Sequence, residues 1–432
     1  DALALIGTID GALEESSEIL LRMRELAVQS ASDTNTGTDR SFIQDEINQL
    51  NNELNRISSS TEFNSVKLLD GTYNNKQIQI GTSANQVFNI GVTSTDAATL
   101  GAYQMESLAE HNATATADAA AAVTAATALI NAAGDYTVKG SFGSTTVNIA
   151  AGDDAKTVAQ SFNLAAGTTG ITAAAITKAK ITAVSAETYS FTLKGKSDTA
   201  STVNATVTSA TNLTALKDAI NSVSGATGIT AALTEDLSGI NLVQQDGFDI
   251  VVGDVTSSGS GTMTMGAADK NGDAVSQAAV ALGGATTTDS QVIIGQISLS
   301  SHKAFTVTSG NAANHFATDT AAQTSTLQTM GAVDISSQSG ATNALSVIDG
   351  AIAMISEIRS EMGAAENRLT STVDNLSNVS VNTQRSLTAV EDANFASETS
   401  ALTKAQILQQ AATSMLAQAN KAKQTMLVLL QG

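Results

Sequence analysis

The stretch LIGTIDGALEESSEILLRMRELAVQS, residues 5–30, decides the fold. Apolar or small side chains recur in it every three or four residues, a spacing that places them on one face of an α-helix. A second apolar stripe runs beside the first, so we expect this helix to be buried over a broad face. The two stripes consist of Ile6, Ile9, Leu13, Ser16, Leu20, Met23 and Ala27, and of Leu5, Ala12, Ile19 and Leu26.

A second amphipathic helix follows the polar break at residues 35–38. Thr38 or Asp39 is the expected N-cap, because either side chain can accept a hydrogen bond from the first helical turn. The short link predicts an antiparallel helical hairpin, and the alternating residues at 77–80 and 86–90 predict a β-hairpin. The apolar face of the second helix is formed by Ile43, Ile47, Leu50, Leu54 and Ile57.

The C-terminal end of the chain has the same helical periodicity. A long apolar seam with alternating steps of three and four residues predicts a long helix that packs against other helices. Two charged residues, Arg359 and Glu366, occupy seam positions, and an Ala-rich second helix is expected over about 395–430. The seam of the first helix is Leu345, Ile348, Ile352, Ile355, Arg359, Met362, Glu366, Leu369, Val373 and Leu376, and that of the second contains Leu402, Leu408, Ala412, Met415 and Ala419.

Residues 104–337 differ from both ends, being rich in Ala, Thr, Ser and Gly and poor in charge. Runs such as 249–252 and 304–307 predict strands between turns, and an Ala-rich helix is expected at about 117–133. The region is therefore predicted to be mostly β.

An internal repeat lies within this region. The sequence Thr-Gly-Ile-Thr-Ala-Ala occurs at 169–174 and again at 227–232, each time after a helical segment. We therefore expect two copies of one helix-plus-strand unit, at about 135–195 and 196–255 and in two lobes.

Composition excludes several functions. The chain has 41 acidic and 21 basic residues, a formal charge of −20, which argues against nucleic-acid and membrane partners. It has no Cys, which excludes disulfides and thiol chemistry, and no Pro, which permits long helices and rapid refolding. No apolar run of about 18 residues predicts a membrane span, and no signal peptide is visible. The chain begins at Asp1 inside a helical pattern, so we expect it to lack its natural N-terminus.

No catalytic or metal site is predicted. Residues 269–273, Asp-Lys-Asn-Gly-Asp, begin like a calcium loop, but Ala274 and Val280 stand where a Gly and a bidentate Glu are needed. The acidic pairs at 153–154 and 235–236 are adjacent residues that do not face each other. The three histidines, His111, His302 and His315, lack metalloprotease spacing. We therefore expect no enzyme activity, no cofactor and no bound metal.

Both ends of the chain resemble bacterial flagellins. The resemblance is carried by LRMRELAVQSA at 21–31, TEFNSVKLLDG at 61–71, VEDANFASET at 390–399, LTKAQILQQA at 402–411 and MLAQAN at 415–420. It implies an α+β multidomain fold with a coiled-coil-like antiparallel helical core, a β-hairpin and a mostly β outer region. The expected domains are 1–103 (N-terminal part of the outer core), 104–337 (variable surface insertion), 338–388 (long helix of the outer core) and 389–432 (helix of the inner core).

The resemblance also implies a function. It predicts an extracellular subunit of the bacterial flagellar filament, which self-assembles with other copies for motility. The expected further partners are a flagellar export chaperone and the filament cap protein. The terminal helix, with its seam at Leu402, Leu408, Ala412, Met415 and Ala419, would pair with an N-terminal segment that is absent from this chain. Two alternatives are a flagellin-like adhesin whose 104–337 insertion binds glycans, and a hook–filament junction protein.

One strip of residues has two interpretations. Arg22, Leu26, Gln29 and Glu46 match positions at which related flagellins contact an innate immune receptor of the Toll-like class. The first three follow at i, i+4 and i+7, on one helix face, and Glu46 lies on the antiparallel neighbour. We expect the strip to serve mainly in filament packing, with receptor binding as a secondary property of the unpolymerised subunit.

Overall fold

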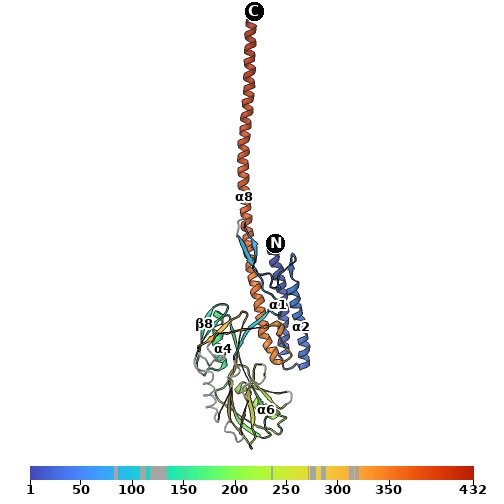
Figure 1. Cartoon of the computed structure of the whole chain (residues 1–432), viewed down its shortest axis with the longest axis vertical. Coiled ribbons are helices and arrows are strands. Elements are labelled where there is room, and N and C mark those ends of the chain that lie inside the picture. Colours follow the sequence, from blue (N-terminus) through green and yellow to red (C-terminus); the bar gives the residue numbers. More distant parts are fainter. Residues whose placement is uncertain are drawn as a thin grey trace. The chain divides into compact units, whose positions relative to one another are not determined.

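Figure 1 shows the computed structural model of the whole chain. The chain divides into two compact units. One contains Asp1–Ile6, Lys76–Ile90 and Gly363–Gly432, and the other contains Gly7–Asn75 and Gly91–Met362. The helix expected at 117–133 lies outside the described residues, as do His111, His315, the acidic pair at 235–236 and much of the loop at 269–280. The described residues are 1–81, 86–107, 113–116, 134–150, 152–234, 237–270, 272, 279–283, 289–310, 316 and 321–432.

The predicted helical hairpin is present as α1 (Ala2–Ser30) and α2 (Gly37–Ser60). All residues of the main α1 stripe are buried, as expected. The N-cap of α2 was predicted wrongly, because Thr36 holds that position. Its hydroxyl accepts from Asp39 N (3.2 Å), while the Asp39 carboxylate accepts from Thr36 N (2.9 Å). This reciprocal pair is a capping box, which satisfies two otherwise unpaired N–H groups and starts the helix at Gly37.

The buried face of α2 departs from the prediction at Leu50, and it also includes Ser58, which was not predicted. Asn51 is buried, whereas the expected Leu50 is only partly so. The Asn51 amide donates to the carbonyl of Met330 (3.1 Å), at the start of the 3₁₀ turn η2 (Met330–Ala332). Gln44 holds the same segment, since its Oε1 accepts from Ile335 N at 2.7 Å. Hydrophobic periodicity could not reveal a buried amide whose partner is so distant in sequence.

The C-terminal end forms one helix, α8 (Gln338–Leu429), where the sequence suggested two. No Gly or Pro occurs between Gly363 and Gly432, so nothing in the sequence interrupts it. Its buried seam was only partly predicted. Ile348, Ile355, Met362 and Leu369 are buried as expected, whereas Leu345, Ile352 and Arg359 are only partly buried and Glu366, Val373 and Leu376 are exposed. Ala344, Ala351, Ile358 and Ala365 are buried in place of Leu345, Ile352, Arg359 and Glu366. The seam is Ala341, Ala344, Ile348, Ala351, Ile355, Ile358, Met362, Ala365 and Leu369, again in steps of three and four.

Arg359 instead makes an ion pair beside the seam. Its Nε lies 2.8 Å from Asp10 Oδ1 on α1, and Nη2 lies 4.0 Å from Glu14 Oε2. The hydrogen bond to Asp10 raises the pKa of Arg359. Arg359, which was predicted to lie in the apolar seam, therefore lies at its edge, where its ion pair with Asp10 links α8 to α1.

Two β-hairpins accompany the helices. The predicted one is formed by β3 (Lys76–Gln79) and β4 (Val87–Ile90), which pair antiparallel. The guanidinium of Arg368 on α8 lies 4.6 Å from the ring centroid of Phe88 on β4, a cation–π contact. The other hairpin joins β1 (Glu62–Phe63) to β2 (Val66–Lys67).

The middle of the chain is mostly β, as predicted, with every strand pair antiparallel. The longest sheet has the order β12-β13-β9-β18-β5-β21, with β15 and β16 attached through β9. The others have the orders β11-β10-β14-β17-β6 and β20-β19-β7-β8. The strands are β5 (Gly101–Glu106), β6 (Ala113–Thr116), β7 (Gly134–Lys139), β8 (Ser144–Ile149), β9 (Thr172–Thr182), β10 (Thr188–Lys194), β11 (Ser201–Thr206), β12 (Ile229–Leu233), β13 (Ile240–Gln244), β14 (Ile250–Ser257), β15 (Met263–Ala267), β16 (Val280–Leu282), β17 (Ser290–Ile293), β18 (Gln296–Ser301), β19 (Thr306–Ser309), β20 (Gln323–Thr324) and β21 (Thr326–Thr329).

The repeated sequence folds twice into the same unit. The first copy runs β7-β8-α4-α5-β9, with α4 at Ala155–Leu164 and α5 at Ala166–Thr169. The second runs β10-β11-α6-α7-β12, with α6 at Thr214–Ser222 and α7 at Ser224–Thr227. A left-handed glycine ends each short helix: Gly170 has φ 74° and Gly228 has φ 70°. The domain and lobe boundaries given above stay predictions.

One asparagine in each copy bridges the helix to the following strand. Asn163 Nδ2 donates to Ala173 O, and Asn163 Oδ1 accepts from Ala173 N, both at 2.8 Å. Asn221 makes the same two bonds with Ala231, also at 2.8 Å. Sequence reading did not single out either residue, although both precede the repeated motif by the same spacing.

We expect Asn221→Ala to lower the free energy of unfolding by about 1–3 kcal/mol, because it leaves two part-buried backbone groups of a strand without their partner, and the exposed Asn163→Ala to lower it by about 0.5–1.5 kcal/mol, because water can replace that partner. Denaturant unfolding measures the loss. Ser161→Ala is the control, since it removes only an exposed hydroxyl bonded within α4. Equal effects in all three variants would show that the amide bridge does not stabilise the unit.

Candidate functional site

The helical hairpin carries the predicted contact strip on its outer side. Arg22 on α1 donates to Glu46 Oε1 on α2 from Nε (3.0 Å) and Nη2 (2.8 Å), and from Nη1 to Glu25 Oε2 (3.1 Å). The bond to Glu46 is the main cause that raises the pKa of Arg22. Gln29 is exposed on the same helix. The structure thus presents Arg22, Gln29 and Glu46 at the surface.

Leu26 does not share that surface, because its side chain is only 1% exposed. Successive residues of an α-helix turn by about 100°, so the step of four from Arg22 rotates Leu26 toward the buried stripe of Met23 and Ala27. In this structure Leu26 supports the strip from within the core. Leu21 and Val28 are the apolar residues that α1 exposes nearby in sequence.

The C-terminal part of α8 exposes many large apolar side chains. Its predicted seam is exposed throughout: Leu408 is 60% and Met415 is 71% accessible, and Leu402, Ala412 and Ala419 are exposed as well. Ile407, Leu416 and Met426 are also exposed. A helix that is apolar around much of its circumference is stable in water only when other surfaces cover it.

The length and composition of α8 would also fit a membrane span. It is the one described helix long and apolar enough, over Gln338–Leu427, and packing helices of water-soluble proteins pass the same test. Apolar residues recur along α8 in steps of three and four, a pattern that favours packing against other helices over insertion into a membrane.

Comparison with known proteins shows the family to which the chain belongs. The family model for the bacterial flagellin N-terminal helical region matches residues 1–74, and that for the C-terminal helical region matches residues 345–430. A B-type flagellin of Pseudomonas aeruginosa is 34% identical over 436 residues, covering 100% of this chain and 86% of that protein. The chain belongs to the bacterial flagellin family.

Other matches agree with this assignment. A flagellin of Salmonella choleraesuis is 32% identical over 452 residues and again covers 100% of this chain and 86% of its own. The flagellin hook IN motif matches residues 190–246, which lie mainly in the second repeat unit. Among solved structures, FliC from Burkholderia pseudomallei covers 85% of this chain and 100% of its own at 19% identity, but its TM-score of 0.34 is too low to carry an argument.

The assignment confirms the predicted α+β class and the predicted function. This flagellin is a structural subunit of the flagellar filament and self-assembles with other flagellin copies, and the filament that flagellins form is extracellular. Flagellins are structural proteins, and among the described residues no group of three or more His, Cys, Asp or Glu side chains could hold a metal ion. The junction-protein interpretation is only a minor alternative.

Sequence analysis of this flagellin missed one titratable group in the insertion. Asp249 precedes β14, and burial raises its pKa to about 7, helped by the nearby charge of Asp154 and opposed by a hydrogen bond from Gly295 N (3.4 Å) and by Lys194. The only feature of the sequence that could have indicated a buried carboxylate is the position of Asp249 between Phe248 and an apolar strand.

Asp249→Asn should therefore stabilise the chain at alkaline pH. The folded-state pKa of about 7 exceeds the unfolded value of about 3.9, so the folded state holds the proton more tightly and stability is lost as pH rises from about 4 to 7. The neutral amide removes this loss, and we expect a gain of about 1–3 kcal/mol at pH 8 that shrinks toward zero near pH 4. Urea unfolding at both pH values tests this, with the exposed Asp254→Asn as control. A gain that does not depend on pH would contradict it.

Proposed function

We propose that the C-terminal part of α8 is the main assembly surface of this filament subunit, with Leu402, Leu408, Ala412, Met415 and Ala419 at its centre. The observation that supports this is the exposure of every one of these apolar side chains in the single chain. Removing apolar surface from water stabilises an assembly by about 25 cal/mol per Å². The seam would pack against a flagellin-type N-terminal helix and against neighbouring subunits.

The strip of Arg22, Gln29 and Glu46 is proposed as a lateral contact between subunits, with Leu26 holding it from the core. In the free subunit the same strip would be open to an innate immune receptor of the Toll-like class. We further propose an export chaperone and a filament cap as partners, the flagellum outside the cell as the location, and no catalytic activity. Residues 104–337 would then face outward, where a glycan-binding role is the second candidate.

The test is seeded growth. The chain, joined to a flagellin-type N-terminal segment, is added to short filament seeds and elongation is followed by negative-stain electron microscopy. Long filaments are expected. Soluble protein that never extends the seeds, but binds to hook preparations, would favour the junction protein instead.

Arg22→Ala should show whether Arg22 contributes to contacts between subunits without contributing to the stability of the folded subunit. Both partners of the pair with Glu46 are about half exposed (50% and 44%), so the unfolding midpoint should hardly change, whereas elongation from seeds should slow. Arg56→Ala, which breaks a similarly exposed pair with Glu53 on α2, is the matched control. If both variants elongate at the unmodified rate, the strip is no subunit contact.

A further inference from the structure

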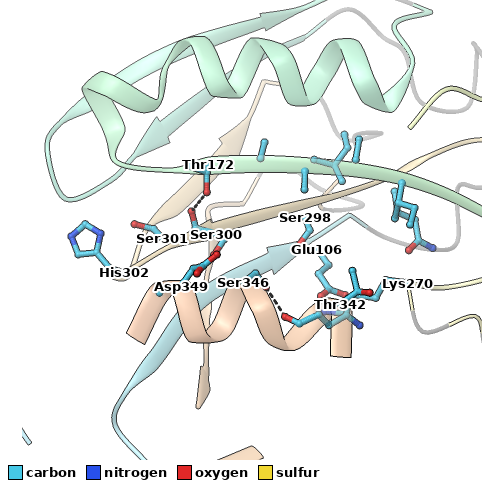
Figure 2. Close-up of a pocket in the computed structure, with 18 of the residues that line it drawn as sticks. Glu106, Thr172, Lys270, Ser298, Ser300, Ser301, His302, Thr342, Ser346 and Asp349 are labelled. Atoms are coloured by element: carbon cyan, nitrogen blue, oxygen red, sulfur yellow. Dashed lines mark hydrogen bonds and ion pairs between the residues drawn. The ribbon is translucent and has the colours of Figure 1, made fainter. Parts of the chain in front are cut away.

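A cavity of about 580 Å³ lies between the longest sheet and the first turns of α8. Figure 2 shows its floor, made by β9, β18 and β5, and the α8 segment that forms the facing wall. Its volume is in the range of sites that take small organic molecules. Neither the assembly surface nor the contact strip uses it.

The floor and wall are lined by small hydroxyl and methyl groups. Thr172, Ser298 and Ser300 come from the strands, and Thr342 and Ser346 face them from α8. Ser346 is tied across to the sheet, because its Oγ accepts from Gln104 Nε2 at 2.7 Å. The hydroxyls of Ser298 and Ser300 have no hydrogen-bond partner among the described residues, although both are half-buried. They can therefore bond to a ligand.

The charges around the cavity are paired with one another. Glu106 pairs with Lys270 at one end, and Asp349 pairs with Arg24 (2.7 Å) on the α8 side. At the other end His302 Nε2 lies 3.6 Å from Glu357, which also pairs with Lys303. With each charge matched, the cavity offers no net attraction to an ion, so its chemistry favours an uncharged ligand.

The same floor disfavours a bound peptide. β18 is hydrogen-bonded along its length to β5 on one side and to β9 on the other. Among the described residues, β18 therefore offers no free edge for a peptide to extend, which is the usual way that an extended chain binds to a sheet. Recognition here must use side-chain hydroxyls and amides.

An exposed aromatic ring lies next to two of the lining residues. Phe142, in the turn between β7 and β8, is 67% exposed, and its ring centroid lies 5.9 Å from that of His302, a lining residue. Gly170, another lining residue, lies against the same ring. A phenyl face beside a hydroxyl-lined pocket suits a ligand with an apolar C–H face and polar edges.

We propose that this cavity binds a neutral saccharide of one or two rings. The hydroxyl groups of one ring would bond to Ser298 and Ser300, and a second ring would extend along β18 toward His302 and Phe142. This proposal rests on the glycan-binding role given above as the second candidate function, and it places that role between the insertion and the first turns of α8.

The test uses the whole chain and defined probes. Saturation-transfer NMR and calorimetry are run with glucose, maltose, N-acetylglucosamine and N,N′-diacetylchitobiose, with glucuronate as the charged comparison. At least one neutral probe should bind with a Kd below roughly 10 mM, and more tightly than glucuronate. No binding by any neutral probe, or preference for glucuronate, would overturn the proposal.

Variants then locate the site. Ser298→Val with Ser300→Val should weaken binding roughly tenfold or more, since two hydrogen bonds are lost while the strand shape is kept. Phe142→Ala should weaken it about three- to tenfold. Phe42→Ala is the matched control, because that phenylalanine is also 67% exposed but lies on α2, whereas Phe142 lies next to the lining residue His302. Each variant is first compared with the unmodified chain in thermal unfolding. If the serine variant fails to fold, the comparison of Phe142→Ala with Phe42→Ala shows whether the sugar binds at this cavity. Equal loss in the two phenylalanine variants would show that the sugar binds elsewhere.

Discussion

Leu408→Asp combined with Met415→Asp is expected to abolish filament elongation while leaving the free subunit folded. Both side chains face water in the single chain, so charged replacements cost the subunit little. In the proposed filament both positions are covered by other helices, where an unpaired carboxylate costs several kcal/mol. Elongation from seeds should therefore fall by at least about 100-fold, since each 1.4 kcal/mol is a factor of ten.

The control places the same charges on the opposite side of the helix from the two substituted residues. Gln410→Asp with Ala417→Asp moves each carboxylate two residues along α8, about 200° around the helix from Leu408 and from Met415, and should permit elongation. Circular dichroism and thermal unfolding of all variants establish that the subunits stay folded. Normal elongation by the Leu408 and Met415 variant would refute the proposed assembly surface.

Gly350→Ala is expected to destabilise the subunit strongly, although alanine is the better helix former. Gly350 lies where α8 crosses β5, and an added Cβ would stand 2.5 Å from Ala102 Cβ and 2.8 Å from Gly101 O. Those atoms belong to a short side chain and to backbone, so helix and strand must move apart. We expect a loss of about 2–4 kcal/mol in the free energy of unfolding, the range of severe overpacking.

The same helix supplies the matched control. A Cβ added at Gly363 meets nothing within 4 Å, so Gly363→Ala should gain up to about 1 kcal/mol from helix propensity alone. Opposite signs in denaturant unfolding would establish the close approach of α8 to β5. Stabilisation by both substitutions would show that α8 does not press on that strand.

Sequence periodicity predicted the elements whose apolar residues repeat at fixed steps. The α1 stripe, the helical hairpin, the β3–β4 hairpin and the helix-plus-strand repeat all follow from patterns within a few residues, where side-chain hydrophobicity decides which face is buried. The long motifs at both ends were sufficient to suggest the family. Neither inference needed contacts between distant parts of the chain.

Errors occurred where a distant partner changed the local preference. Periodicity favoured Leu50, but Asn51 is buried because its amide reaches the Met330 carbonyl. It placed Arg359 in the α8 seam, but Asp10 draws that side chain to the edge and Ile358 is buried instead. It grouped Leu26 with Arg22, although the hairpin core takes up Leu26.

By itself, therefore, the sequence determined the helical ends, the β-rich middle, the repeat and the flagellin resemblance, because these depend on local spacing and on motifs. Only the tertiary structure decided which residues of each face are buried. It also decided that Asp249 is shielded from water and that Ser298, Ser300 and Ser346 line one cavity. Those properties arise from packing between segments far apart in the chain, and the free energy of burying a polar group depends on the partner that packing supplies.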